Sequence, residues 1–154
     1  MDAKSYLMGV FDGEGCVATG KGGSGAWFVQ ANVTMASEAV CQLFQDTWGG
    51  SRSKRSKPTM GGLIMHTWSV NSSRGIPFLE YVVEHSLVKR EQAAIALQMA
   101  RNIAKYAERG YRRGIGLSRG ARILTDEDHA ERERLVMQIR ALNGGRSRFA
   151  KVAT

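Results

Sequence analysis

The most informative stretch of this sequence is Ser5-Tyr6-Leu7-Met8-Gly9-Val10-Phe11-Asp12-Gly13-Glu14-Gly15. Its first seven residues are mainly apolar and Ser5 is a suitable N-cap, which predicts a short helix over residues 5–11. That helix runs directly into two acids, although a helix C-terminus already presents unpaired carbonyl oxygens with partial negative charge. A hard divalent cation would compensate, because magnesium binds carboxylates, backbone carbonyls and water. The alternative is a helix stop followed by a turn with solvated acids.

The composition limits the class of protein. The chain has 154 residues, of which 43% are hydrophobic, enough for one packed core. A net charge of +8 favours a polyanionic partner, with nucleic acid first and an acidic membrane surface second. No window approaches the roughly eighteen apolar residues of a membrane helix, and the acidic N-terminus is not typical of a signal peptide. We therefore expect a soluble intracellular protein.

The two cysteines, Cys16 and Cys41, exclude a disulfide scaffold and a four-cysteine zinc site. Both lie in apolar surroundings, so we expect both to be small buried hydrophobic residues.

Hydrophobic periodicity then predicts two hairpins, each followed by a helix, with further helices toward the C-terminus. The expected segments are strands 16–19, 26–35, 51–57 and 63–70 and helices 37–47, 76–84, 89–107 and one capped by Thr125. Strand 26–35 alternates clearly. One face carries Trp27, Val29, Ala31, Val33 and Met35, and the other carries Phe28, Gln30, Asn32 and Thr34.

Residues 6–15 resemble the motif that defines the LAGLIDADG homing endonucleases. The matching positions are Leu7, Gly9, Asp12, Gly13 and Gly15, and Glu14 conservatively replaces the terminal acid of the motif. Later features follow the order of the family over most of the chain. These are the helix closing on Trp48-Gly49-Gly50, Lys89 with Gln92, and Ala141-Leu142-Asn143 before a basic tail.

The resemblance implies an α+β fold with an αββαββα core, in which a curved antiparallel sheet forms a DNA-binding saddle and helices pack behind it. We expect one domain over 1–154, with a core of about 5–107, a basic loop 108–122, and a C-terminal helix and basic tail 123–154. A single motif copy implies a homodimer joined through the motif helix. Its expected interface residues are Tyr6, Leu7, Gly9 and Val10.

The implied activity is that of a site-specific homing endonuclease, encoded by an intron. It would make a metal-dependent staggered double-strand break in a long, partly palindromic DNA target. The expected cofactor is Mg²⁺, and Mn²⁺ or Ca²⁺ could substitute in binding. Glu14 would bind the metal through its side chain and Gly13 through its carbonyl. Asp12 is expected to order neighbouring backbone, with direct metal contact left open.

Lys89 would be a second catalytic residue that orients water or stabilises developing charge. The family often has polar residues at two pocket positions, where this chain has Met35 and Ala39. Asn32 or Thr34 could supply the missing polar group.

DNA contacts are expected from the polar strand face, since Gln and Asn suit adenine edges, and from basic residues, which suit guanine or phosphate. The residues expected to contact DNA are Lys21, Phe28, Gln30, Asn32, Thr34, Arg52, Lys54, Arg55, Arg146, Ser147 and Arg148.

The alternative is a cleavage-deficient relative on the same fold, either an RNA-splicing maturase, with intron RNA as a partner, or a DNA-binding regulator. Glu14 favours the enzyme and Met35 weakly favours the alternative. An organelle, a bacterial cytoplasm and a phage-infected cell all fit the sequence.

Overall fold

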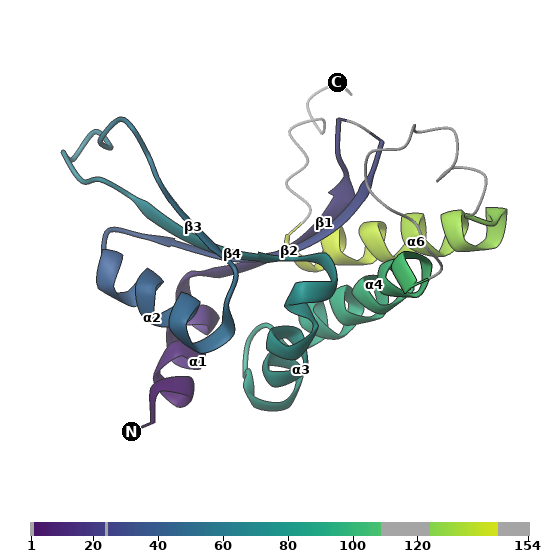
Figure 1. The fold of residues 1–154 in the computed structure, drawn as a ribbon, viewed down its shortest axis with the longest axis horizontal. Coiled ribbons are helices and arrows are strands. Elements are labelled where there is room, and N and C mark those ends of the chain that lie inside the picture. The colour runs from purple at the N-terminus through teal and green to yellow at the C-terminus, as the bar shows by residue number, and fades with distance from the viewer. Residues whose placement is uncertain (1, 24, 109–123, 145–154) are drawn as a thin grey trace, which may run out of the picture.

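The computed structural model describes residues 2–23, 25–108 and 124–144, and Figure 1 shows their arrangement. A curved antiparallel sheet carries helices on one of its sides, and its strand order is β1-β2-β4-β3. The elements are α1 (Ala3–Glu14), β1 (Gly15–Lys21), β2 (Trp27–Met35), α2 (Glu38–Trp48), β3 (Ser51–Lys54), β4 (His66–Asn71), η1 (Ser72–Gly75), α3 (Ile76–His85), α4 (Arg90–Glu108) and α6 (Asp126–Leu142). The predicted α+β class and curved antiparallel sheet are confirmed.

The motif helix α1 is longer at both ends than predicted. Its N-cap is Asp2 rather than Ser5, because an Asp2 carboxylate oxygen accepts from the Ser5 amide at 3.1 Å. At the other end the helix includes both acids and passes directly into β1 at Gly15. A Cβ at position 15 would collide with the ring and carbonyl of Phe11. Glycine is therefore required where the helix becomes a strand.

The core lies between the helices and the inner face of the sheet. Trp68 of β4 is fully buried, with its ring centroid 4.7 Å from Phe44 of α2 and 5.0 Å from Phe78 of α3. Its indole N–H donates to the carbonyl of Gly49 at 2.8 Å, so the tryptophan also fixes the end of α2. Aromatic residues of this size contribute most of the burial energy of a small core.

The outer face of the sheet is not covered by any helix of the described residues (Figure 1). The predicted alternation of β2 is confirmed, because Val29, Ala31 and Val33 are buried while Gln30 and Asn32 are only partly so. Neighbouring residues of β2 therefore face opposite sides of the sheet, one the core and the other the outer surface.

The later helices lie close to their predicted bounds, and Thr125 caps α6 through a hydrogen bond from the Asp128 amide at 3.1 Å. Most of the predicted basic loop 108–122 lies outside the described residues, because only Glu108, at the end of α4, is described. The predicted basic tail from residue 145 also lies outside them. Within the described part, no helix is long and apolar enough to cross a membrane.

One of the two expectations for cysteine is wrong. Cys41 is fully buried, as predicted, but Cys16 is exposed. Val17 faces the core, so strand alternation turns Cys16 to the outer face.

Candidate functional site

The end of α1 presents a free carboxylate. The side chain of Glu14 is exposed, and it forms no hydrogen bond or ion pair with any other described residue. The preceding Gly13 is also exposed. The described residues of one chain contain no group of three or more His, Cys, Asp or Glu side chains that could hold a metal ion. The chain itself thus offers one free acid and the backbone carbonyls at the helix end.

Asp12 has a different environment from Glu14. One of its carboxylate oxygens accepts a hydrogen bond from the Ser86 hydroxyl, and the other accepts from the Leu87 amide at 2.9 Å. Partial burial acts to raise the pKa of the Asp12 carboxyl, but hydrogen bonds from Ser86 and the backbone of Leu87, Val88 and Lys89 outweigh it and lower the pKa. Asp12 therefore orders the turn between α3 and α4, which is distant in sequence, and both of its oxygens are engaged.

Lys89, on that turn, lies beside the start of β1. The two share an open cavity of about 410 Å³, lined by Gly15, Cys16, Val17, Lys89, Gln92, Leu142, Asn143 and Gly144. Asn143 closes one wall by donating to the carbonyl of Val17 at 3.0 Å. The fold thus brings the predicted residue Lys89 and its neighbour Gln92 next to the end of the motif helix, more than seventy positions away in sequence.

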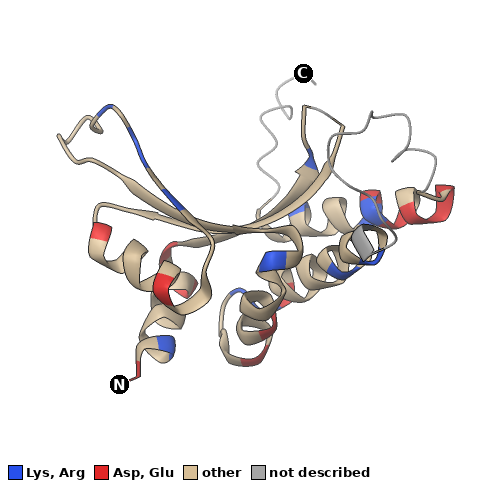
Figure 2. Cartoon of the chain, in the orientation of Figure 1, with Lys and Arg blue, Asp and Glu red and all other residues tan. Residues whose placement is uncertain are grey.

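Figure 2 shows how charge is distributed around the sheet. Lysine and arginine follow the hairpin between β3 and β4, whereas the first turn of α6 is acidic through Asp126, Glu127 and Asp128. The outer face of the strands themselves is uncharged. Register and alternation assign it Cys16, Ala18, Gly20, Phe28, Gln30, Asn32, Thr34, Ser51, Ser53, Thr67, Ser69 and Asn71.

The sequence prediction missed the β4 and β3 part of this face. Asn71 is the cross-strand partner of Gln30, and Ser69 is the partner of both Asn32 and Ser51. The alternation of Trp68 and Val70 with their polar neighbours could have revealed these residues. A continuous row of amide and hydroxyl groups therefore crosses β2, β4 and β3.

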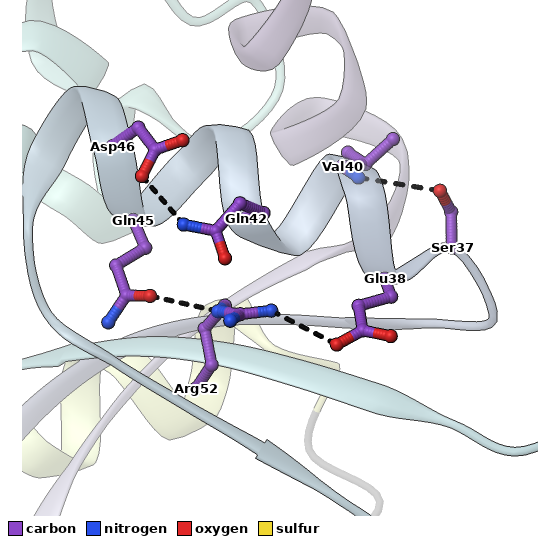
Figure 3. A network of polar contacts seen from close by, with 7 residues as sticks. All are labelled: Ser37, Glu38, Val40, Gln42, Gln45, Asp46 and Arg52. Carbon is purple, nitrogen blue, oxygen red and sulfur yellow. Dashed lines mark hydrogen bonds and ion pairs between the residues drawn. The ribbon is translucent and has the colours of Figure 1, made fainter.

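Arg52, which was expected to read guanine or hold phosphate, does not lie on that face. It is the cross-strand partner of buried Trp68 and points toward α2 (Figure 3). Its Nε donates to the Gln45 side-chain oxygen at 2.8 Å, and its Nη1 lies 3.5 Å from a Glu38 carboxylate oxygen. Arg52 thus ties β3 to α2.

The other predicted DNA contacts are divided between the two faces. Lys54 shares the face of Arg52, and Lys21 shares the face of Trp27, over whose ring its ammonium lies at 5.3 Å. Arg55 continues the ladder, since its amide donates to the Met65 carbonyl at 2.9 Å, and alternation turns its side chain to the outer face. Arg146, Ser147 and Arg148 lie outside the described residues.

The predicted dimer-interface residues also differ in exposure. Tyr6 is 40% exposed, Gly9 is exposed and Val10 is partly exposed, and all three lie on one face of α1. Leu7 is only 1% exposed and belongs to the core of its own chain, so including it in an interface was wrong. Gly9 and Gly13 have no side chain, which leaves the exposed face of α1 flat. A Cβ at either position would meet no atom of another part of the chain within 4 Å.

The two candidate substitutes for a polar pocket residue differ in availability. The hydroxyl of Thr34 pairs with that of Thr67 at 2.9 Å. Asn32 is the cross-strand partner of Cys16, which lines the cavity, and its amide donates to Gln30 at 3.4 Å. Asn32 is thus paired across the strands with a residue of the cavity wall, while Met35 is half-buried and Ala39 exposed.

The fold is that of the LAGLIDADG homing endonucleases. The chain is similar to the homing endonuclease I-CvuI, solved in complex with its target in the presence of Ca, with a TM-score of 0.70, 18% identity, and coverage of 94% of this chain and 83% of that one. It is also similar to the archaeal intron-encoded I-Vdi141I complexed with DNA, with a TM-score of 0.54, 13% identity, and coverage of 91% and 96%.

A third similar structure is the LAGLIDADG homing endonuclease I-GzeII in complex with its DNA target. The TM-score is 0.60 and the identity 12%, and the match covers 90% of this chain but 43% of that one. No protein-family model matches the sequence, and no curated protein is significantly similar to it.

Proposed function

We propose that this chain is a site-specific DNA endonuclease that works as a homodimer. The observation that carries the proposal is the free carboxylate of Glu14, which ends the helix packed beneath an open polar sheet. Lys89 lines the cavity whose wall includes Gly15, the residue that follows Glu14. The reaction is hydrolysis of one phosphodiester bond in each strand of a duplex. Intron encoding belongs to the same proposal.

The outer face of the sheet is the surface that would meet the DNA. Its amide and hydroxyl groups match the donors and acceptors of base edges in the major groove. Gln30, Asn32 and Asn71 suit adenine, and Arg55 at the rim suits phosphate or guanine. Direct base contacts would therefore come mainly from neutral groups, and the positive charge of the chain would act from the periphery.

The metal expected at this fold is compatible with the residues at the end of α1. Glu14 would bind it through its free carboxylate and Gly13 through its carbonyl, which are the oxygen ligands that Mg²⁺ accepts. When bound, such an ion polarises the phosphate and lowers the pKa of water. Lys89, which lines the cavity beside the end of α1, would hold the attacking water in place or stabilise charge on the phosphate.

A second copy of this chain would complete the site. The flat face of α1, formed by Tyr6, Gly9, Val10 and Gly13, allows close approach of the same helix from a partner. Each copy would bring its own Glu14 to the two-fold axis, so a divalent ion could be shared between two carboxylates. The target would accordingly be long and partly palindromic.

The second candidate function is that of a cleavage-deficient nucleic-acid-binding relative, an RNA-splicing maturase or a DNA-binding regulator. It is favoured by Met35 and Ala39, which place no polar group at two pocket positions.

Selection of cleaved sites from a randomised or genomic DNA library with Mg²⁺ tests the proposal directly. The expected result is cleavage at one defined, partly palindromic site. On that site Glu14→Gln should reduce cleavage at least about 10³-fold while affinity in Ca²⁺ changes less than about 2-fold. Glu133→Gln, on the exposed side of α6, is a matched control because it makes the same change of charge at a residue with no described side-chain partner. Equal losses of cleavage and binding in Glu14→Gln would refute the metal role. Binding without cleavage in the unaltered chain would support the second candidate.

A further inference from the structure

Ser86 joins the ends of three helices. Its amide donates to the Val82 carbonyl at 2.9 Å, which closes α3. Its hydroxyl donates to Asp12 of α1 and accepts from the amide of Lys89 at 2.7 Å, one residue before α4 begins. The residue is fully buried although it is polar. A single hydroxyl therefore connects the acidic end of the motif helix to the residue that carries the ammonium group.

A further hydrogen bond spans this turn, from Arg90 Nη2 to the Glu84 carbonyl at 3.3 Å, and it joins α3 to α4 without reaching α1. Leu87 is 90% exposed and Val88 is 59% exposed, so neither is packed into the core of its own chain. The Leu87 amide is fixed by the second oxygen of Asp12, and the Lys89 carbonyl accepts from Ala93 at 2.9 Å as α4 starts. Among the described residues, the hydrogen bonds that join this turn to α1 pass through Asp12, and Ser86 links one of them directly to the Lys89 amide.

We propose that Ser86 is a positioning residue for DNA cleavage, which sets the place of Lys89 relative to Glu14 through its hydroxyl. This inference rests on the proposed endonuclease function. Glu14 is two residues beyond Asp12 on the same helix, so a shift of the 86–89 turn changes the separation of the two groups that face the phosphate. Reaction rates are sensitive to such separations, and a displacement of about 1 Å can cost about 100-fold.

Removal of the hydroxyl has a defined local effect. Ser86→Ala keeps Cβ and the backbone bond to Val82, but it leaves the Lys89 amide and one Asp12 oxygen without their partner. Ser86→Thr keeps the hydroxyl. Val136→Ala in α6 removes buried volume far from the turn and controls for stability alone.

The test compares these variants by single-turnover cleavage and by DNA affinity in Ca²⁺, at a temperature where all are folded. We expect Ser86→Ala to slow cleavage about 10-fold or more with affinity within about 2-fold, and Ser86→Thr to recover most of the rate. In a Lys89→Ala background the Ser86→Ala change should cost less than about 2-fold, because the residue that it positions is gone.

An Ser86→Ala rate equal to that of Val136→Ala would overturn the inference, and so would an undiminished cost in the Lys89→Ala background. These results leave the proposed function intact, since the unaltered chain still cleaves. A chain that cleaves no DNA overturns both.

Discussion

Arg52 and Arg55 are three residues apart on the same hairpin, yet their side chains have different surroundings, and the proposed function therefore gives them different roles. Arg52→Ala removes a hydrogen bond to Gln45, worth about 1 kcal/mol, and a half-exposed ion pair with Glu38, worth about 0.5 kcal/mol. The expected loss of unfolding free energy is therefore about 1.5 kcal/mol, or about 3–6 °C in Tm for a chain of this size. Arg55→Ala breaks no described side-chain contact and should change Tm by less than about 1 °C.

The order reverses for DNA binding. Each phosphate contact contributes about −0.9 to the slope of log K against log salt, so two copies of Arg55→Ala should reduce the slope by about 1.8. Arg52→Ala should leave the slope unchanged. Thermal unfolding and titrations at several salt concentrations measure both quantities on the same two proteins. A salt slope that falls in Arg52→Ala, or a Tm that falls in Arg55→Ala, would refute the assignment of faces.

The remaining predictions concern the thiols, the motif helix and acid. A thiol reagent should modify Cys16 quickly and Cys41 slowly, because burial raises the pKa of the Cys41 thiol, and a bulky label on Cys16 should weaken DNA binding; Cys16→Ser is the control. Gly9→Leu should leave the monomer folded, since the new Cβ meets open space, but should abolish the dimer in analytical ultracentrifugation; an unchanged dimer mass would exclude α1 as the interface. Without divalent metal, the folded chain holds the pKa of Asp12 below its unfolded value of about 3.9, so this stabilisation is complete above that value and is lost as pH falls through the folded pKa. The stability advantage over Asp12→Asn in urea unfolding should therefore be present at pH 7 and vanish in strong acid, and an advantage that persists there would contradict the assignment.

Much of the fold was predictable because its strongest patterns are local. The alternation of Val29, Ala31 and Val33 fixed the buried side of β2, and Gly49-Gly50 marked the end of α2. At Gly50 a φ of +88° and the carbonyl of Ser69 together exclude a side chain, so glycine there has a physical reason. Thr125 predicted the start of α6 for a similarly local reason, because its hydroxyl accepts from the amide of Asp128 three residues later.

The errors arose where the pattern is short or the partner is distant. Strand β3 contains only Ser51 to Lys54 and no apolar residue, so nothing in it shows which side faces α2; only its pairing with Trp68 does. The start of α1 was predicted at Ser5, whereas the N-cap is Asp2; both residue types are good N-caps, so residue type alone does not decide between them. The link from Asp12 to Ser86 spans 74 positions and has no sequence signature.

The site was partly predictable for the same reasons. Glu14 and Lys89 are predicted site residues that rest on the resemblance, whereas the position of Asn71 and Ser69 on the outer face required the register of β4 against β2. Leu7 illustrates the limit of a motif, because a matching residue can serve the subunit core instead of its surface.

The uncovered side of the sheet separates recognition from folding. Its amide and hydroxyl side chains project away from the packed aromatic residues beneath, and substitutions at such positions usually change stability by less than about 0.5 kcal/mol. The chain can therefore exchange these groups one at a time while its scaffold persists. Under the proposed function, such a layout would allow the recognised DNA sequence to change, by evolution or by design, without first having to stabilise the fold.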